Sequence, residues 1–224
     1  GYDGFFFELY LRLAADWLPQ PLFIVGQTGT LTRLTKNVGH FNDKQSAELS
    51  AISTRHGVGL KEHNGDYLPD EILLKHPGLG ITAMNVAPAY GTIETRAYLK
   101  LAEVEKDLAA NGFIKSASHL KTVLTRECVL SHKWEKWMTD EHKNKSEEQI
   151  FNEPELLKEI LELSGHYNYE KPAVVAEMQT MFANLKSFGI EPERYVINKI
   201  KDMIQNEAEC FNMPGLTTRV AQAK

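Results

Sequence analysis

Short apolar runs and longer amphipathic stretches alternate along the first half of the chain. Residues 22–26 are continuously apolar between a proline and Gly26, and two further runs of strand character cover residues 57–62 and 80–86. A short apolar run bounded by Pro and Gly is typical of a strand covered on both faces. Residues spaced three and four apart predict helices before each run, over residues 5–18, 43–56 and 70–75.

Three strands joined by helical connections favour a parallel sheet, because parallel neighbours require a crossover. The predicted fold class is therefore α/β. A long helix is predicted to follow over residues 92–110, with an apolar stripe along one side.

From residue 117 onward the apolar spacing is helical, with no strand pattern. Gly189 and Pro192 stand where a helix C-terminus and a first-turn proline belong. We predict two domains, residues 1–112 with the βα units and residues 113–224 as a helical region packing on them. The expected helices cover residues 117–130, 132–143, 153–164, 172–188 and 192–211, and the stripe Val174, Val175, Met178, Phe182 and Leu185 is expected to be buried.

Composition narrows the class of protein. The 224 residues are 42% apolar and 25% charged, and the net charge of −5 is spread without a basic block, so nucleic acid is not an expected partner. The apolar runs are too short to span a membrane. Cys128 and Cys210 lie far apart without a CxxC spacing, and no signal-peptide pattern is seen, which favours a cytoplasmic location.

Candidate chemistry gathers where the predicted strands end, since reactive groups of parallel α/β proteins lie at that edge of the sheet. The first exit carries Gln27 and Gly29, and His40 follows in the same loop. All three are candidate substrate-binding residues.

The second exit is the richest in functional groups. His63 is flanked by Glu62, Asn64, Gly65 and Asp66. A neutral imidazole can bind a metal or move a proton, and neighbouring carboxylates can orient it or act as bases. The alternative is a histidine held by structural hydrogen bonds.

The third exit runs from Asn85 to Tyr90 and then to Gly91 and Thr92, which are predicted to open the long helix. Free N–H groups there would bind a phosphate or carboxylate, whereas a simple N-cap role for Thr92 is the alternative. The sequence contains no GxGxxG, GxxxxGK[ST], GxSxG or HExxH motif. Dinucleotide-binding, P-loop, α/β-hydrolase and zincin classes therefore have no motif to support them.

Taken together, the three exits resemble the accessory, non-catalytic Z-type subunits of class II tagatose-bisphosphate aldolases. The resemblance covers roughly residues 22–212 with gaps and is most specific at His63-x-x-Asp66-Tyr67. The matching residues are Gln27, Gly29, Val38-Gly39-His40-Phe41, Glu62-His63-Asn64-Gly65-Asp66-Tyr67, Ala87-Pro88, Arg96, Leu101, Glu105, Val129-Leu130, Trp134 and Ile197-Asn198-Lys199-Ile200.

That family is similar to the metal-dependent class II fructose-bisphosphate aldolases, which are TIM (β/α)8 barrels. The resemblance implies that His63 is a ligand of a divalent metal, with zinc the expected ion, and that Asn85 contacts the substrate and begins a phosphate-binding loop. Gln27 stands where the catalytic enzymes place another histidine ligand. Asn64-Gly65-Asp66 replaces their Gly-Gly-Ser loop. A site with fewer imidazoles is expected to bind a metal more weakly or differently.

Length is a second departure from the barrel enzymes. A closed barrel needs eight strands and about 250 residues. The resemblance therefore implies that this chain holds only the later strands and a helical C-terminal extension. The earlier half would be absent from this sequence or would lie in another polypeptide.

Three hypotheses follow. The first is an oligomeric accessory subunit that assists a catalytic aldolase subunit in cleaving tagatose bisphosphate. The second is a metal-dependent epimerase of a sugar or sugar phosphate, in which Glu62 or Asp66 moves protons and Gln27 and Asn85 bind hydroxyl groups. The third is a structural or interaction scaffold without chemistry.

Overall fold

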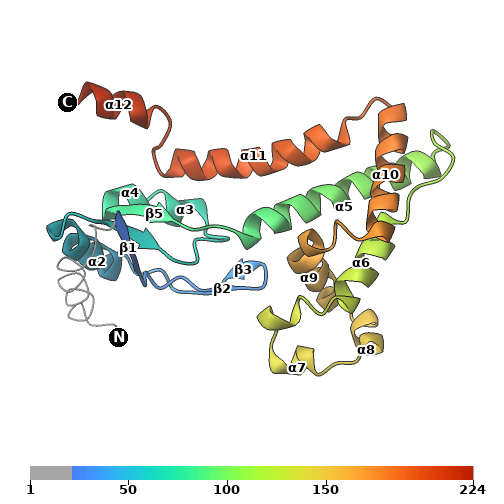
Figure 1. Ribbon diagram of the computed structural model, residues 1–224, viewed down its shortest axis with the longest axis horizontal. Coiled ribbons are helices and arrows are strands. Elements are labelled where there is room, and N and C mark those ends of the chain that lie inside the picture. The colour runs from blue at the N-terminus through green and yellow to red at the C-terminus, as the bar shows by residue number, and fades with distance from the viewer. Residues whose placement is uncertain (1–21, 224) are drawn as a thin grey trace. The chain divides into compact units, whose positions relative to one another are not determined.

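The computed structural model describes residues 22–223 (Figure 1). The helix predicted over residues 5–18 lies outside the described residues. Two compact units divide the chain: a sheet unit with residues up to 87 and from 204 onward, and a helical unit with residues 88–203.

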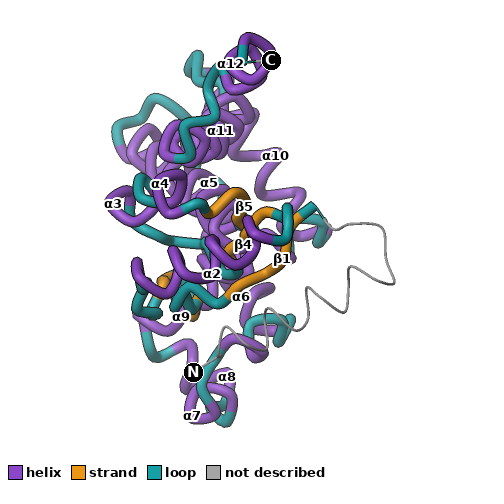
Figure 2. The backbone as a smooth tube through the Cα atoms, turned by 90° about the vertical axis from the view of Figure 1, so that its left-hand side faces the viewer, coloured by secondary structure: helices purple, strands orange, loops and turns teal. Residues whose placement is uncertain are grey.

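The sheet unit contains three parallel strands, β1 (Phe23–Gly26), β4 (Gly59–Glu62) and β5 (Ile81–Met84), in the order β1-β4-β5 (Figure 2). The prediction of neighbouring parallel strands is thus confirmed. Gly26 pairs with Glu62, and Glu62 pairs with Met84, so the three strands end at one level. This register brings the three predicted exits to one edge of the sheet.

Helices α2 (Asp43–Arg55), α3 (Asp70–Leu73) and α4 (His76–Leu79) connect the strands. The side chain of Asn42 caps α2 by accepting a hydrogen bond from the backbone of Gln45, which satisfies one of the helix's free N–H groups. Helix α2 packs on β1 and β4, and α4 packs on β5. The core cluster between these elements consists of Leu49, Leu60 and Ile81, with Phe41 and Phe211 packed against it.

A small antiparallel hairpin, β2 (Thr32–Arg33) and β3 (Lys36–Asn37), lies in the segment that was predicted to be a polar loop. Strands of this length are too short to produce a periodic pattern in the sequence. Leu34 has a positive φ of 53° at the turn, which is uncommon for a residue with a side chain.

The helical unit begins with α5, which starts at Pro88 and not, as predicted, at Thr92. Proline is favoured in the first turn of a helix, so the helix begins at Pro88, about one turn before the predicted start. Within residues 22–223 no strand follows Met84, which confirms the helical second half. The main helices are α5 (Pro88–Ala110), α6 (Leu120–Leu130), α9 (Pro154–Ser164), α10 (Pro172–Ser187) and α11 (Pro192–Cys210), the last of which continues into the sheet unit.

Shorter elements replace the single helix that was predicted over residues 132–143. His132 has a positive φ of 53°, which interrupts a continuous helix there. The segment instead forms the 3-10 turn η1 (Glu135–Trp137) and α7 (Asp140–Lys143). The other short elements are α8 (Glu147–Phe151), η2 (Gly165–Tyr167) and α12 (Leu216–Gln222).

The predicted apolar stripe of α10 is only partly buried. Val174 and Leu185 are fully buried, as is Met181, which the prediction omitted. Val175 is 36% exposed, because it lies beside the stripe of residues spaced three and four apart. Across residues 22–223 no helix has both the length and the apolar character that crossing a bilayer requires.

Candidate functional site

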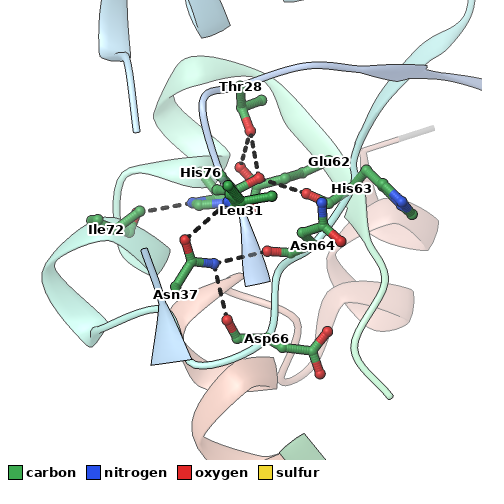
Figure 3. A network of polar contacts seen from close by, with 10 residues as sticks. Thr28, Leu31, Asn37, Glu62, His63, Asn64, Asp66, Ile72 and His76 are labelled. Carbon is green, nitrogen blue, oxygen red and sulfur yellow. Dashed lines mark hydrogen bonds and ion pairs between the residues drawn. The ribbon is translucent and has the colours of Figure 1, made fainter. Parts of the chain in front are cut away.

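The side chain of Glu62 turns into the sheet unit and is completely buried. Its Oε2 accepts a hydrogen bond of 2.6 Å from the hydroxyl of Thr28, and its Oε1 lies 2.8 Å from Nε2 of His76 (Figure 3). Glu62, the last residue of β4, is thereby hydrogen-bonded to the loop after β1 and to helix α4.

His76 is held on both ring nitrogens. Nδ1 lies 2.8 Å from the carbonyl oxygen of Ile72, which only accepts, so Nδ1 carries a proton. Nε2 makes the contact with Oε1 of Glu62 described above. The ring is fully buried, stacks on Phe41 with centroids 5.3 Å apart, and contacts Phe211. His76 lies at the start of α4, where a histidine is unremarkable in sequence, and only its tertiary partner distinguishes it.

His63 lies on the other side of the strand end and is exposed to solvent. Its Nδ1 is 3.0 Å from the amide oxygen of Asn85, and Figure 3 shows the ring pointing away from the Glu62 network. Because an amide oxygen only accepts, Nδ1 donates in this contact, and in the neutral form of the ring the lone pair then lies on Nε2. The structure therefore joins two of the predicted site residues, although the contact to Nδ1 comes from an amide rather than from the carboxylate of Glu62.

Asp66 is almost completely buried, and its Oδ1 accepts a 2.9 Å hydrogen bond from the backbone of Ala87. Asp66 therefore joins the loops that follow β4 and β5. The geometry gives both Glu62 and Asp66 contacts of a structural kind, and their roles in proton transfer stay predictions.

Asn37 holds the loop after β1 against the loop that carries His63. Its amide nitrogen donates to the carbonyl oxygens of Asn64 and Asp66, each at 3.0 Å, and its amide oxygen accepts from the backbone of Leu31 and Gly39. Asn64 has a positive φ of 59°, a conformation that these bonds help to maintain.

Thr30 adds a further bond to the same loop, from its hydroxyl to the carbonyl oxygen of His63 at 2.6 Å. Gly65 also fits closely, because a side chain there would collide with Met84. Its backbone N–H donates to the carbonyl of Asn85 at 3.1 Å. The backbone around His63 is thus fixed by bonds from both neighbouring loops.

The predicted residues of the first exit take different positions. Gln27 is exposed directly after β1, at the same edge of the sheet as His63. Gly29 adopts a φ of 96° and approaches the carbonyl of His40 so closely that a side chain would not fit. The side chain of His40 is exposed. Substrate binding by Gln27, Gly29 and His40 stays a prediction.

Tyr90, Gly91 and Thr92 belong to the helical unit. Thr92 is completely buried inside α5, so the N-cap alternative is wrong. The imidazole of His166 lies against the α carbon of Gly91 and would collide with any side chain there. Burial, reinforced by Lys136 and Lys133, lowers the pKa of His166. Phosphate binding by Gly91 and Thr92 stays a prediction.

Lys61 is a candidate that the sequence reasoning missed. Side chains alternate along a strand, so Leu60 and Glu62 point to the helix-covered face while Lys61 points to the opposite one. Its Nζ lies 5.3 Å from the centroid of the Phe23 ring. The strand period continued by one residue places His63 on the side of Lys61, and this alternation could have identified it.

The residues present supply one ligand of a divalent ion rather than a complete site. His63 offers Nε2, and Asn85 orients the ring in the way that outer-shell partners of metal-bound histidines do. Among residues 22–223 no group of three or more His, Cys, Asp or Glu side chains is arranged to hold a metal ion. Such a site would need donors from beyond the described residues.

The sequence matches no protein-family model and no curated protein. Among the solved structures that share its fold are two proteins named for sugar metabolism. A probable tagatose 6 phosphate kinase of Sinorhizobium meliloti 1021 aligns with 85% of this chain and 53% of its own, at 15% identity and a TM-score of 0.64. A glycerol complex of a fructuronate-tagaturonate epimerase of Cohnella laeviribosi aligns with 92% and 42%, at 11% identity and a TM-score of 0.56.

The chain thus spans about half the length of each of these proteins. At this level of identity the likeness concerns the fold. That fold is shared with proteins named for the metabolism of sugars and sugar acids. Neither of the two is named as an aldolase or as an aldolase accessory subunit.

Proposed function

We propose that this chain is part of a sugar-converting protein of carbohydrate metabolism whose site lies around His63 and Asn85. The observation that carries the proposal is the 3.0 Å contact between these two side chains at the carboxyl edge of parallel strands. Ligands of α/β proteins bind at that edge. Epimerisation of a sugar acid or sugar phosphate is the favoured reaction, because one structural neighbour is named as an epimerase.

In this proposal the chain's own residues prepare one imidazole. The amide oxygen of Asn85 accepts a hydrogen bond from Nδ1–H of His63, which fixes the tautomer and leaves Nε2 directed outward. A divalent ion bound there would polarise a hydroxyl or carbonyl oxygen of the sugar. Lys61, on the same face of the sheet, would attract a carboxylate or phosphate group of the substrate.

The open side of the sheet supports a larger (β/α)8 barrel. Within residues 22–223, β1 is an edge strand, and on its side away from α2 Phe23 and Val25 are 39% and 48% exposed. Apolar side chains on such a face are usually covered, and an inward face of a barrel is covered by the other strands. We infer that further strands pack there and supply the remaining donors.

An accessory role in tagatose-bisphosphate cleavage is the second candidate. The sequence resemblance at the second exit favours it, and a single available imidazole fits a subunit that does not catalyse alone. The two candidates differ in whether the protein is active without a catalytic aldolase subunit.

The test measures bound zinc and enzymatic activity. It uses the purified protein that contains this chain together with the further barrel strands proposed above. Fructuronate, tagaturonate and ketohexose phosphates are offered with and without a class II aldolase. Epimer formation without aldolase supports the first candidate, and stimulation of added aldolase supports the second.

His63→Ala should abolish zinc retention and activity, and Asn85→Ala should weaken zinc binding by about 10- to 100-fold, as loss of an orienting partner does. Folding should be unchanged because His63 is exposed. His119→Ala, which removes an exposed histidine of the helical unit, serves as the matched control. Unchanged zinc content and activity in His63→Ala would contradict the proposal.

A further inference from the structure

The helical unit contains a groove that lies between α5, α6 and α9, and we name it the three-helix groove. It has a volume of about 520 Å³, within the range of small-molecule sites. All its lining residues belong to the helical unit. Each helix contributes one face, since the lining positions recur at spacings of three and four.

Leucines form the apolar part of this groove. Leu161 is buried, and Leu99 and Leu157 are half-buried, so part of their apolar surface faces the groove. An apolar floor with charged groups around it is the usual construction of a site that binds a small polar organic molecule.

Arg96 is the most firmly held cation of the groove. Its Nε and Nη2 donate to the same oxygen of Glu162 at 3.0 and 2.6 Å, and the Glu162 side chain is only 9% exposed. The guanidinium is therefore fixed by a nearly buried carboxylate while 47% of the Arg96 side chain stays exposed. A fixed cation costs little further ordering when it meets an anion.

Three lysines accompany Arg96. Lys100 pairs with Glu103 at 2.9 Å. Lys121 and Lys158 have no ion-pair partner among residues 22–223, although Lys121 contributes to lowering the pKa of Glu103 after the larger effect of Lys100.

Four cationic and two acidic side chains line the groove, which leaves an excess of two positive charges. The whole chain has a net charge of −5, so the excess is local. A surface of this kind attracts anions of matching charge and size.

We propose that the three-helix groove is a second ligand site, which binds the phosphate monoester of a sugar-sized molecule through Arg96, Lys121 and Lys158. A phosphate monoester carries a charge of about −1.5 to −2 at neutral pH, which matches the local excess. Lysine ammonium groups and arginine are the usual partners of phosphate oxygens. The leucines would contact the carbon skeleton. This site is independent of His63 and of the reaction proposed above.

The probe is glucose 6-phosphate, titrated into the full chain by isothermal calorimetry, with glucose and inorganic phosphate in parallel. We expect saturable binding of glucose 6-phosphate, weaker binding of inorganic phosphate, and no binding of glucose. Methyl NMR signals of Leu157 and Leu161 should shift during the titration, and binding should persist in His63→Ala.

The double variant Lys121→Gln/Lys158→Gln should weaken glucose 6-phosphate binding by about 10-fold or more, because charge-assisted hydrogen bonds are lost. Lys186→Gln/Lys199→Gln removes the same charge from two half-exposed lysines elsewhere in the helical unit and should leave affinity unchanged. Equal affinity in the two double variants, loss of binding in His63→Ala, or absence of saturable binding would overturn the proposal. Preferential binding of an oligoglutamate peptide would overturn the ligand class.

Discussion

Each of the two units buries a glutamate completely, but they stabilise its carboxylate in different ways. In the sheet unit Glu62 contacts the hydroxyl of Thr28 and the imidazole of His76. In the helical unit the donors to Glu105 among residues 22–223 are neutral: the backbone and hydroxyl of Ser118 at 2.9 and 2.6 Å, and the amide of Asn184 at 2.6 Å. A buried carboxylate is costly unless its oxygens are hydrogen-bonded, and both units meet this requirement.

The difference shows what each network does in its unit. The Glu62 network includes a second titratable group, His76, and lies at the strand end from which His63 projects. The Glu105 network joins α5 to α10 and to the segment before α6, with no titratable partner. The first network therefore fixes the strand end next to the candidate site, whereas the second stabilises helix packing.

The largest effect is expected from splitting the Glu62–His76 pair. Glu62→Leu or His76→Leu alone should lower the free energy of unfolding by about 3–5 kcal/mol, since each leaves a buried partner uncompensated. The double variant should recover much of that loss, because it removes both groups. Urea denaturation followed by circular dichroism measures this cycle, and additive effects of the two single changes would show that the pair is not coupled.

Glu105→Ala should lower the free energy of unfolding by about 3 kcal/mol, because three donors lose their acceptor. Asp107→Asn, at an exposed position on the same helix, should change it by less than about 0.5 kcal/mol. The same denaturation experiment applies. If the two variants are equally stable, the Glu105 network contributes nothing to the helical unit.

Asn37→Asp tests whether the loop contacts position His63. A carboxylate facing the carbonyl oxygens of Asn64 and Asp66 cannot donate, so two hydrogen bonds are lost at a cost of about 1–2 kcal/mol. We expect the NMR signals of the His63 ring to shift away from the Nδ1-protonated tautomer.

Thr30→Val removes the hydroxyl bond to the backbone of His63 and should shift the ring signals in the same direction. Lys36→Ala, an exposed change in the same hairpin, is the control. Ring signals identical in all variants would limit Asn37 to a purely local role.

The smallest effect concerns pH in the helical unit. Burial lowers the pKa of His166, so the unfolded chain takes up this proton more readily than the folded chain. Stability should therefore fall as pH drops below the ordinary histidine pKa of about 6.5. His166→Phe, which keeps a ring there, should weaken this dependence when melting is followed between pH 7.5 and 5. An unchanged pH dependence would exclude His166 as its source.

Much of the secondary structure was predictable because strong local signals mark it. The three strands are bounded by Pro, Gly or polar residues, as the sequence predicted. Gly189 and Pro192 separate α10 from α11, also as predicted. The hairpin at residues 32–37 and the break at His132 were missed, since each depends on a single residue with positive φ that the pattern does not reveal. Whether the strands belong to a closed barrel stays a prediction.

The candidate site divides in the same way. The chain order of hydrophobic and polar residues determined that His63 and Asn85 each follow a strand, and parallel pairing then brings them to one edge. Only the tertiary structure decided their partners: Asn85 contacts His63, whereas Glu62 pairs with His76, which lies fourteen residues further along in another element. Strand periodicity is a local property of the backbone, but hydrogen-bond partners depend on how separate elements pack, and one sequence position contains no record of that packing.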